Sequence, residues 1–282
     1  MNILITGGTG FLGRHIISKC IVSGHNVVSL SHSEAREKEV QLKYPDVSFY
    51  AADISHNKDI IDSVVKKHNI DYIIHAAAMK YIGICENNPT RTVQVNIDGS
   101  RNIIEIAKNN GVKNVIAVST DKAINPTSVY GSSKFLMEKL MLENGFSVIQ
   151  GVNFFFSTGS VLDLWENFKN EGKEIGVNVE DTTRYFVNAN DVADKILENL
   201  DTHGEYLSLD ECYRVSLHDL AKAFCEYNDY YKTKDYVSIS AEKTIEEIPE
   251  NVSIINANVD TIKSLLHEYY SGEVTVWKLI KL

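Results

Sequence analysis

The segment Asn2-Ile-Leu-Ile-Thr-Gly-Gly-Thr-Gly-Phe-Leu-Gly13 decides the fold. Residues 2–6 form a short apolar run, which is typical of a strand buried on both faces of a sheet. Three glycines, spaced Gly-x-x-Gly-x-x-Gly, then lead into a helical pattern over residues 14–23. Glycine lets backbone amides approach a phosphate closely, and the start of a helix adds partial positive charge. Strand, turn and helix in this order predict a dinucleotide-binding turn, formed by Gly7, Thr9, Gly10, Phe11, Leu12 and Gly13.

Strands and helices continue to alternate along the chain. Further strands are predicted at residues 25–30, 47–51, 72–75, 114–118 and 147–150, and helices at residues 60–68, 96–109 and from about 128 to 143. This alternation predicts an α/β fold with a Rossmann-type, doubly wound parallel sheet. After residue 150 the pattern is less regular, with helices predicted at residues 161–169, 190–200, 216–227 and 260–269. We therefore expect a dinucleotide-binding lobe at residues 1–150 and a smaller, irregular α/β substrate lobe at residues 151–282, interwoven with the first.

The composition is that of an ordinary soluble globular protein, with 44% apolar and 23% charged residues. The net charge of -10, without a run of basic residues, argues against a nucleic-acid or membrane partner. Cys20, Cys85, Cys212 and Cys225 form no CxxC pair and no cluster with histidines, so we expect reduced thiols and no metal site. Because the chain shows no leader pattern and no apolar run long enough to cross a bilayer, we expect a cytoplasmic protein.

Residues after the third and fourth predicted strands extend the cofactor site. Asp53 and Ile54 suit the adenine edge of a dinucleotide. Ala76, Ala77 and Ala78 are small, so the backbone there can pass close to the cofactor. These positions agree with a dinucleotide lying across the ends of the strands.

The end of the second predicted strand bears on the choice of cofactor. Ser31 and His32 stand where a site selective for NAD usually has an acidic residue for the ribose hydroxyls. The nearby guanidinium that could hold an NADP phosphate belongs to Arg36. These residues leave the choice between NAD and NADP open.

Residues 119–134, Ser-Thr-Asp-Lys-Ala-Ile-Asn-Pro-Thr-Ser-Val-Tyr-Gly-Ser-Ser-Lys, carry groups suited to proton transfer. Tyr130 and Lys134 are four residues apart and so share one face of the predicted helix. An ammonium beside a phenol favours the phenolate, which makes Tyr130 a usable base near neutral pH. Thr120 offers a hydroxyl at the end of the preceding strand, and Asp121 and Lys122 follow at once. The stretch therefore predicts more than a single base and its helper.

Together these motifs resemble the extended short-chain dehydrogenase/reductase superfamily. The resemblance rests on Thr6-Gly-Gly-Thr-Gly-Phe-Leu-Gly13, Asp53-Ile54, His75-Ala-Ala-Ala78, Asn96 and Tyr130-x-x-x-Lys134. Within that superfamily, residues 119–134 and residues 75–89, HAAAMKYIGICENNP, look like the inverting UDP-N-acetylglucosamine 4,6-dehydratases of polysaccharide and pseudaminic acid pathways. The match is strong over residues 1–145 and thinner beyond.

The resemblance implies a reaction in two stages on a tightly bound NAD or NADP, with Asn96 among the cofactor contacts. Tyr130, assisted by Lys134 and Thr120, takes the proton of the sugar C4 hydroxyl as hydride passes to the nicotinamide. The 4-keto group then acidifies the C5 proton. Asp121 and Lys122 remove that proton and protonate the departing C6 hydroxyl, after which hydride returns to C6.

The resemblance also implies a UDP-sugar substrate and a place for its contacts. The residues concerned are Lys80, Asn153, Ser160, Arg184 and Lys243. It further suggests at least a homodimer, formed by the helices at about 96–109 and 130–143.

Departures from the dehydratase pattern weaken the substrate assignment. His32 stands where those enzymes carry an arginine for the NADP phosphate, which favours NAD slightly. Gln150 or Gly151, and Thr158, stand where the dehydratases carry arginines. We expect the C4, C5 and C6 chemistry to be retained and the residues that bind the substrate to differ from those of the dehydratases.

Three hypotheses follow. The first is a 4,6-dehydratase, or a variant that performs only the later part of the reaction on a 5,6-unsaturated sugar nucleotide. The second is a 4-epimerase or 4-keto reductase that uses Tyr130 and Lys134 alone. The third is a non-catalytic protein that senses NAD(P).

Overall fold

The computed structural model describes residues 1–178, 182–236 and 247–271. The chain forms two compact units: Met1–Gly151, Ala189–Leu209 and Pro249–Asn251 make up the first, and Val152–Asn188, Asp210–Ile248 and Val252–Leu282 the second. The predicted lobe boundary at residue 150 lies next to the first break between these units. The second unit differs from the predicted lobe 151–282, because Ala189–Leu209 belongs to the first unit.

The first unit is built on a seven-stranded sheet in which all neighbouring strands are parallel. In sheet order the strands are β10 (Tyr206–Leu207), β6 (Ser147–Gly151), β5 (Asn114–Thr120), β4 (Tyr72–His75), β1 (Asn2–Thr6), β2 (Asn26–Ser31) and β3 (Ser48–Ala51). The prediction of a doubly wound parallel sheet is confirmed. Ile3, Leu4 and Ile5 of the interior strand β1 are fully buried, and each such side chain contributes roughly 1.5–3 kcal/mol to folding.

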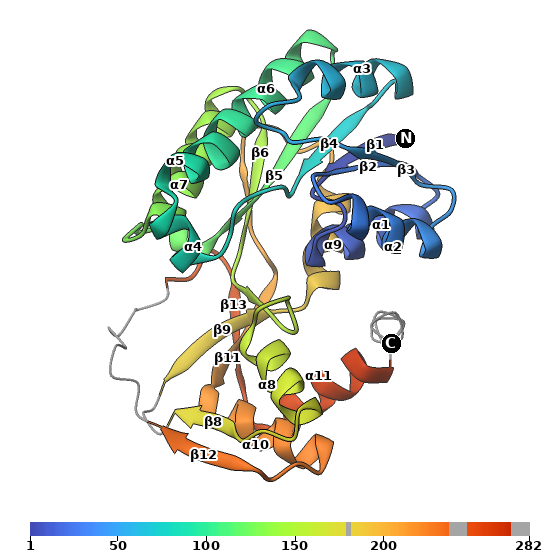
Figure 1. Ribbon diagram of the computed structural model, residues 1–282. Coiled ribbons are helices and arrows are strands. Elements are labelled where there is room, and N and C mark those ends of the chain that lie inside the picture. Colours follow the sequence, from blue (N-terminus) through green and yellow to red (C-terminus); the bar gives the residue numbers. More distant parts are fainter. Residues whose placement is uncertain (179–181, 237–246, 272–282) are drawn as a thin grey trace. The chain divides into compact units, whose positions relative to one another are not determined.

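Helices cover both faces of this sheet (Figure 1). They are α1 (Phe11–Val22), α2 (Glu34–Lys43), α3 (Lys58–His68), α4 (Ile82–Asn87), α5 (Pro89–Val93), the π-helical turn η1 (Gln94–Asp98), α6 (Gly99–Asn109), the 3₁₀ turn η2 (Asp121–Ala123), α7 (Val129–Glu143) and α9 (Ala189–Glu198). The chain moves in one direction along the sheet from β1 to β3 and in the other from β4 to β6. Because parallel crossovers are right-handed, α1 and α2 lie on one face and α3, α6 and α7 on the other. Helix α9 packs against α1.

The change of direction between β1 and β4 positions the candidate site. In parallel sheets, ligands bind beyond the carboxyl ends of the strands, at the point where the strand order reverses. The carboxyl ends of β1, β4 and β5 are neighbours in the sheet and lead into the glycine turn, the Ala76–Ala78 run and Thr120–Lys122. The fold therefore brings together segments that are more than a hundred residues apart in sequence.

Several predicted elements have different bounds in the structure. Helix α1 begins at Phe11, three residues before the predicted start, because Gly10 already takes the N-cap position. The helix predicted over residues 96–109 begins as the π-helical turn η1 and continues as α6. Gly111 follows that helix with φ of +65°, as expected for a C-terminal glycine. Helix α2 was not predicted, because its sequence is charged and lacks a clear apolar stripe.

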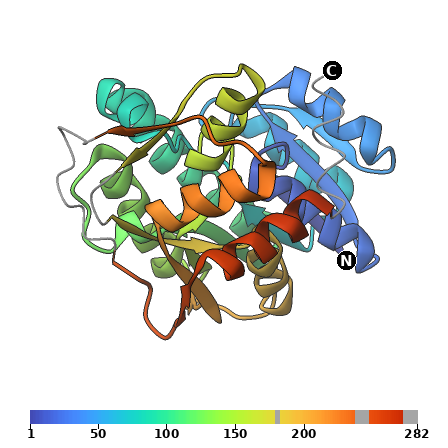
Figure 2. The same ribbon diagram turned by 90° about the horizontal axis from the view of Figure 1, so that it is seen from below.

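The second unit contains a mixed sheet in the order β13 (Ser253–Ala257), β11 (Glu211–Ser216), β9 (Thr183–Val187) and β7 (Asn153–Phe154). Strands β12 (Thr233–Tyr236) and β8 (Ile175–Asn178) pair separately, and the helices are α8 (Val161–Asn170), α10 (Leu217–Asn228) and α11 (Val259–Ser271). Figure 2 shows α10 beside α11, which agrees with their packing contacts. The expected irregular α/β character of this part is observed.

Candidate active site

The glycine turn is closed tightly by its own backbone and by the Ala76–Ala78 run. Gly7 has φ of +74°, and a Cβ atom on it would lie 2.8 Å from the Ala77 amide nitrogen. A Cβ atom on Gly13 would lie 2.3 Å from the Gly7 carbonyl oxygen. Helix α1 starts with Gly10 as N-cap, without a side-chain cap and without an acidic residue in its first turn. Amides in a first helical turn lack acceptors within the helix. The turn from Gly7 to Gly13, called the glycine cradle below, therefore fits a phosphate group of a dinucleotide.

We expect Gly13→Ala to weaken NAD binding by more than about tenfold, because the new methyl group must displace the backbone of the cradle. Calorimetric titration with NAD measures the effect. Gly83→Ala is the matched control, since a Cβ atom on Gly83 meets nothing within 4 Å. Equal NAD affinity of the two variants would contradict this account of the turn.

A buried chain of hydrogen bonds fixes the end of β4 against its neighbours. The Thr6 hydroxyl and His75 Nδ1 lie 2.7 Å apart, and His75 Nε2 and the Ser100 hydroxyl 3.0 Å apart. The Ala77 amide donates to the Thr6 hydroxyl over 3.4 Å. Burial lowers the pKa of His75 to about 3, with a smaller contribution from the Lys134 charge. His75 is therefore a neutral structural residue that places the alanine run.

Asn96 is fully engaged by protein groups. Its side chain accepts a hydrogen bond from the Met79 amide (2.8 Å) and donates to the Met79 carbonyl (3.0 Å) and the Ser133 hydroxyl (2.9 Å). The Ser133 hydroxyl donates in turn to the Tyr130 carbonyl over 2.7 Å. Asn96 thus ties the segment after β4 to the start of α7. Its predicted contact with the cofactor stays a prediction, and these bonds indicate an indirect role.

Asp53 is held by an ion pair that the sequence did not reveal. Its Oδ1 accepts hydrogen bonds from the Ser55 amide (2.8 Å) and hydroxyl (2.6 Å), and its Oδ2 pairs with the Arg91 guanidinium. Burial alone raises the pKa of Asp53, but the bonds from Ser55 and Arg91 outweigh it and lower the pKa to about 2. The side chain of Ile54 is buried, and its carbonyl accepts from Asn102 over 2.9 Å. Their contact with adenine stays a prediction.

The lowered pKa of Asp53 predicts a contribution to acid stability. The contribution is present above the ordinary carboxyl pKa and is lost as the pH falls through about 2. Between pH 4 and pH 2, the free energy of unfolding should fall more steeply in the wild type than in Asp53→Asn. Denaturant unfolding across that range measures the slopes. Glu143→Gln, which removes an exposed carboxyl, should keep the wild-type slope, and an unchanged slope in Asp53→Asn would refute the assignment.

An acidic side chain lies next to the carboxyl end of β2. Glu37, in the unpredicted helix α2, is buried, and its Oε1 accepts from the Ser31 amide (3.3 Å) and hydroxyl (3.2 Å). Burial is the main reason why the pKa of Glu37 is raised. His32 and Arg36 are exposed. No acid occupies residues 31–33, as the sequence shows, but α2 brings the Glu37 carboxylate onto Ser31.

The residues after β5 form a compact acid–base group. The Thr120 hydroxyl donates to Asp121 Oδ1 over 2.7 Å. Lys122 Nζ lies 3.1 Å from each oxygen of the Asp121 carboxylate. Asp121 is 3% exposed, whereas the Lys122 side chain is partly exposed. A buried carboxylate that accepts hydrogen bonds from an ammonium and a hydroxyl is suited to taking up and releasing protons.

Tyr130 and Lys134 follow on helix α7, whose N-cap Ser128 accepts from the Gly131 amide over 3.0 Å. Lys134 is buried, its Nζ donates to the Val118 carbonyl over 2.6 Å, and burial lowers its pKa to about 8. Burial raises the pKa of Tyr130, a hydrogen bond with Thr120 lowers it, and Asp121 raises it again. The prediction of a lowered Tyr130 pKa is therefore wrong in this structure, because burial outweighs the hydrogen bond.

The predicted substrate residues lie in both units. Lys80, in the first unit, is exposed and has its Nζ 5.2 Å from the centre of the Tyr81 ring. In the second unit, Asn153 donates to the Tyr185 carbonyl over 2.9 Å, and Arg184 donates to the Thr183 carbonyl over 2.9 Å. The Ser160 hydroxyl caps α8 by accepting from the Asp163 amide. Lys243 lies outside the described residues.

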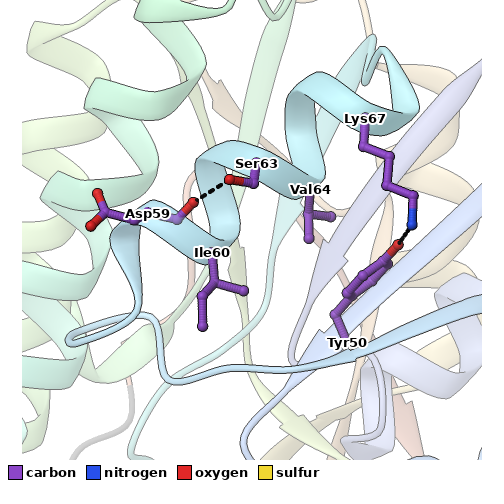
Figure 3. A pocket seen from close by; sticks show the side chains of 6 residues that line it. All are labelled: Tyr50, Asp59, Ile60, Ser63, Val64 and Lys67. Carbon is purple, nitrogen blue, oxygen red and sulfur yellow. Dashed lines mark hydrogen bonds between the residues drawn. The ribbon is translucent and has the colours of Figure 1, made fainter.

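An open surface pocket of about 340 Å³ lies elsewhere in the first unit (Figure 3). Its lining comes from the edge strand β3 and from α3: Tyr50, Asp59, Ile60, Ser63, Val64 and Lys67. The Lys67 ammonium donates to the Tyr50 hydroxyl over 3.0 Å. The lining includes none of the residues proposed for cofactor or chemistry.

Two classes of site are absent from the described part of the chain. Among residues 1–178, 182–236 and 247–271, no group of His, Cys, Asp and Glu side chains could hold a metal ion. The four cysteines are buried and unpaired by disulfides. Within the same ranges, every helix is too short or too polar to span a membrane.

The chain is similar to known proteins over most of its length. The family described as "Polysaccharide biosynthesis protein" matches residues 3–259. The chain is 31% identical over 238 residues to a UDP-N-acetylglucosamine 4,6-dehydratase (inverting) of Campylobacter jejuni, a match that covers 79% of this chain and 70% of the relative. It is 32% identical over 212 residues to a UDP-glucose 4-epimerase of Rickettsia rickettsii, covering 70% of this chain but only 61% of that relative.

Solved structures support the same grouping. Pen from Bacillus thuringiensis has a TM-score of 0.80 at 26% identity, with 94% of this chain and 97% of that chain covered. The dTDP-glucose 4,6-dehydratase DesIV from Streptomyces venezuelae, solved with NAD and TYD bound, has a TM-score of 0.77 at 16% identity, covering 97% and 98%. At that identity the second likeness shows the fold alone. The match over residues 3–259 and the relative at 31% identity show that the chain belongs to the polysaccharide biosynthesis protein family of extended short-chain dehydrogenase/reductase enzymes.

Proposed function

We propose that the protein oxidises a UDP-N-acetylhexosamine at C4, carries out acid–base chemistry at C5 and C6, and releases a 4-keto-6-deoxy sugar nucleotide. The observation that carries this proposal is the buried Asp121 carboxylate, bonded to both the Thr120 hydroxyl and the Lys122 ammonium. An enzyme that only oxidises and reduces C4 needs Tyr130 and Lys134 but has no use for a second acid–base pair. The relative at 31% identity, named as a UDP-N-acetylglucosamine 4,6-dehydratase, supports the same reaction.

Tyr130 takes the proton of the C4 hydroxyl in this proposal. Burial raises the pKa of Tyr130, whereas its hydrogen bond with Thr120 lowers that pKa and so favours the phenolate that acts as the base. The Lys134 ammonium, buried beneath the same helix face, stabilises the phenolate as it forms.

Asp121 and Lys122 act at the second stage. Once C4 is a ketone, the C5 proton is acidic enough for one of these two groups to remove. The other protonates the C6 hydroxyl so that water can leave. Because the Lys122 ammonium lies 3.1 Å from both carboxylate oxygens, the pair exchanges a proton without a large movement.

The cofactor proposed is NAD, held by the cradle from Gly7 to Gly13. When bound, it supplies an acceptor for the C4 hydride and later returns that hydride to C6. Glu37 supports NAD over NADP, since a buried carboxylate beside Ser31 repels a 2′-phosphate and can accept from ribose hydroxyls. Asn153, Ser160 and Arg184 stay our proposal for contacts with the sugar nucleotide.

Incubation in deuterated water tests the reaction. UDP-N-acetylglucosamine and, separately, its 5,6-unsaturated derivative are followed by proton NMR. A new C6 methyl group with deuterium at C5 supports the proposal, and the substrate that gives it decides between full dehydration and the later part of the reaction. Unchanged spectra in both tubes would overturn it.

A 4-epimerase is the second candidate, because the chain also matches a UDP-glucose 4-epimerase at 32% identity. It predicts inversion at C4, no deuterium at C5 and no new methyl group. The same spectra distinguish it.

We also propose a homodimer formed through α6 and α7. Leu136 of α7 is 48% exposed, so it is accessible to a second copy of the chain. Light scattering coupled to size-exclusion chromatography tests it, and a monomeric mass would refute it.

A further inference from the structure

Glu138 is a buried carboxylate that the proposed chemistry does not yet use. It lies four residues after Lys134, as Lys134 lies four residues after Tyr130, so the three side chains share one face of α7. Glu138 is 1% exposed and Lys134 is 4% exposed. A buried carboxylate is unfavourable unless hydrogen bonds or an opposite charge stabilise it, so its partners indicate its purpose.

Two strands hold the Glu138 carboxylate in one orientation. Gln150, in β6, donates from Nε2 to Oε1 over 3.0 Å, and the Tyr206 hydroxyl, in β10, donates to Oε2 over 3.0 Å. Lys139 supports Tyr206 by donating to its hydroxyl over 3.3 Å. Both oxygens are therefore anchored from the sheet, and the charge is fixed beneath the face of α7.

Lys134 carries a positive charge one helical turn before Glu138, on the same face of α7. Its ammonium donates to the Val118 carbonyl over 2.6 Å, a neutral acceptor that does not compensate the buried charge. Burial lowers the pKa of Lys134 to about 8, and Glu138 acts in the opposite direction and raises it. His75, at the end of β4, also interacts electrostatically with Lys134, but burial keeps His75 neutral. Tyr130 lies one helical turn before Lys134 on α7.

We propose that Glu138 is a positioning residue that keeps Lys134 protonated and aligned beneath Tyr130, with its own carboxylate held by Gln150 and Tyr206. Its effect on turnover rests on the proposed function, but its effect on Lys134 does not. Without Glu138, the buried ammonium loses its opposing charge, so Lys134 releases its proton at lower pH. The phenolate form of Tyr130 then loses its stabilising cation.

The titration of Lys134 tests this directly. The NAD-loaded protein is labelled with ¹³C at lysine Cε, the Lys134 signal is assigned by its loss in Lys134→Met, and its shift is followed against pH. Glu138→Gln should lower the Lys134 midpoint by about one pH unit. Glu143→Gln removes an exposed carboxyl from the same helix and should leave the midpoint unchanged. Coincident curves for Glu138→Gln and the wild type would overturn the proposal.

A second variant and a rate measurement separate charge from structure. Glu138→Asp keeps the negative charge but, with its shorter side chain, holds that charge farther from Lys134. It should therefore lower the Lys134 midpoint by less than Glu138→Gln does, and it provides the test if Glu138→Gln does not fold. In the pH profile of kcat/KM, the high-pH limb should move down with the Lys134 midpoint. A shifted midpoint with no turnover of any sugar nucleotide by the wild type would overturn the proposed function and leave the role of Glu138 intact. A loss of rate with an unmoved midpoint would mean a structural role only.

Discussion

Tyr130→Phe is expected to lower kcat for sugar oxidation by about 10²–10⁴-fold, which is the usual contribution of a positioned general base. The variant loses the hydroxyl that shares a hydrogen bond with Thr120 but keeps the ring within its partly buried site. Affinity for NAD should stay near the wild-type value, because the glycine cradle and Lys134 are unchanged. Single-turnover formation of reduced nicotinamide, followed by absorbance, measures the effect.

The control for this prediction is the phenylalanine next to Lys134. Phe135→Leu changes an aromatic side chain on the same helix without touching the hydrogen bonds of Thr120 or Asp121. It should oxidise substrate at a rate within a few-fold of the wild type. Equal rates for Tyr130→Phe and the wild type would remove Tyr130 from the chemistry.

Asp121→Asn should separate the two stages of the reaction. Asparagine can still accept from the Thr120 hydroxyl, but it cannot take up a proton, so removal of the C5 proton and loss of the C6 hydroxyl should slow by about 10²–10⁴-fold. Oxidation at C4 should be affected less, so reduced nicotinamide and a 4-keto sugar should accumulate on the enzyme. Rapid quenching followed by mass spectrometry of the bound sugar detects them.

The contrast between the two variants is the informative result. Tyr130→Phe should block reduction of the nicotinamide, whereas Asp121→Asn should permit a single round of it. If Asp121→Asn instead turns over at the wild-type rate, the carboxylate is incidental and the 4-epimerase becomes the better assignment. Lys122→Gln should behave like Asp121→Asn, since the two groups act as a pair.

The parts of the fold that could be predicted are those specified by residues close together in sequence. The apolar run of β1 and the glycines that follow specify a strand, a turn and a helix within a dozen residues, and the structure places Gly7 against Ala77 as the cradle requires. Tyr130 and Lys134 were placed on one helix face by their spacing alone. Local periodicity is sufficient for such features because the residues concerned contact each other or their immediate neighbours.

Two of the missed contacts join residues far apart in sequence. Arg91 pairs with Asp53, which is 38 residues away in sequence. Tyr206 donates to Glu138, which is 68 residues away. Glu37 reaches Ser31 only because α2 forms, and that helix has no apolar stripe to predict it. The lowered pKa expected for Tyr130 failed for a related reason, since burial at the site depends on how α7 packs and not on the neighbouring residues alone.

The central claim is that one hydride leaves C4 and returns to C6 of the same sugar while the cofactor stays bound. UDP-N-acetylglucosamine carrying deuterium at C4 tests it most directly, with the product analysed by NMR and mass spectrometry in ordinary water. If the 5,6-unsaturated sugar is the true substrate, the same label is placed at its C4. The account predicts a product with a 4-keto group and one deuterium in its C6 methyl group. Deuterium retained at C4 of an inverted sugar, or lost to free reduced cofactor, would contradict it.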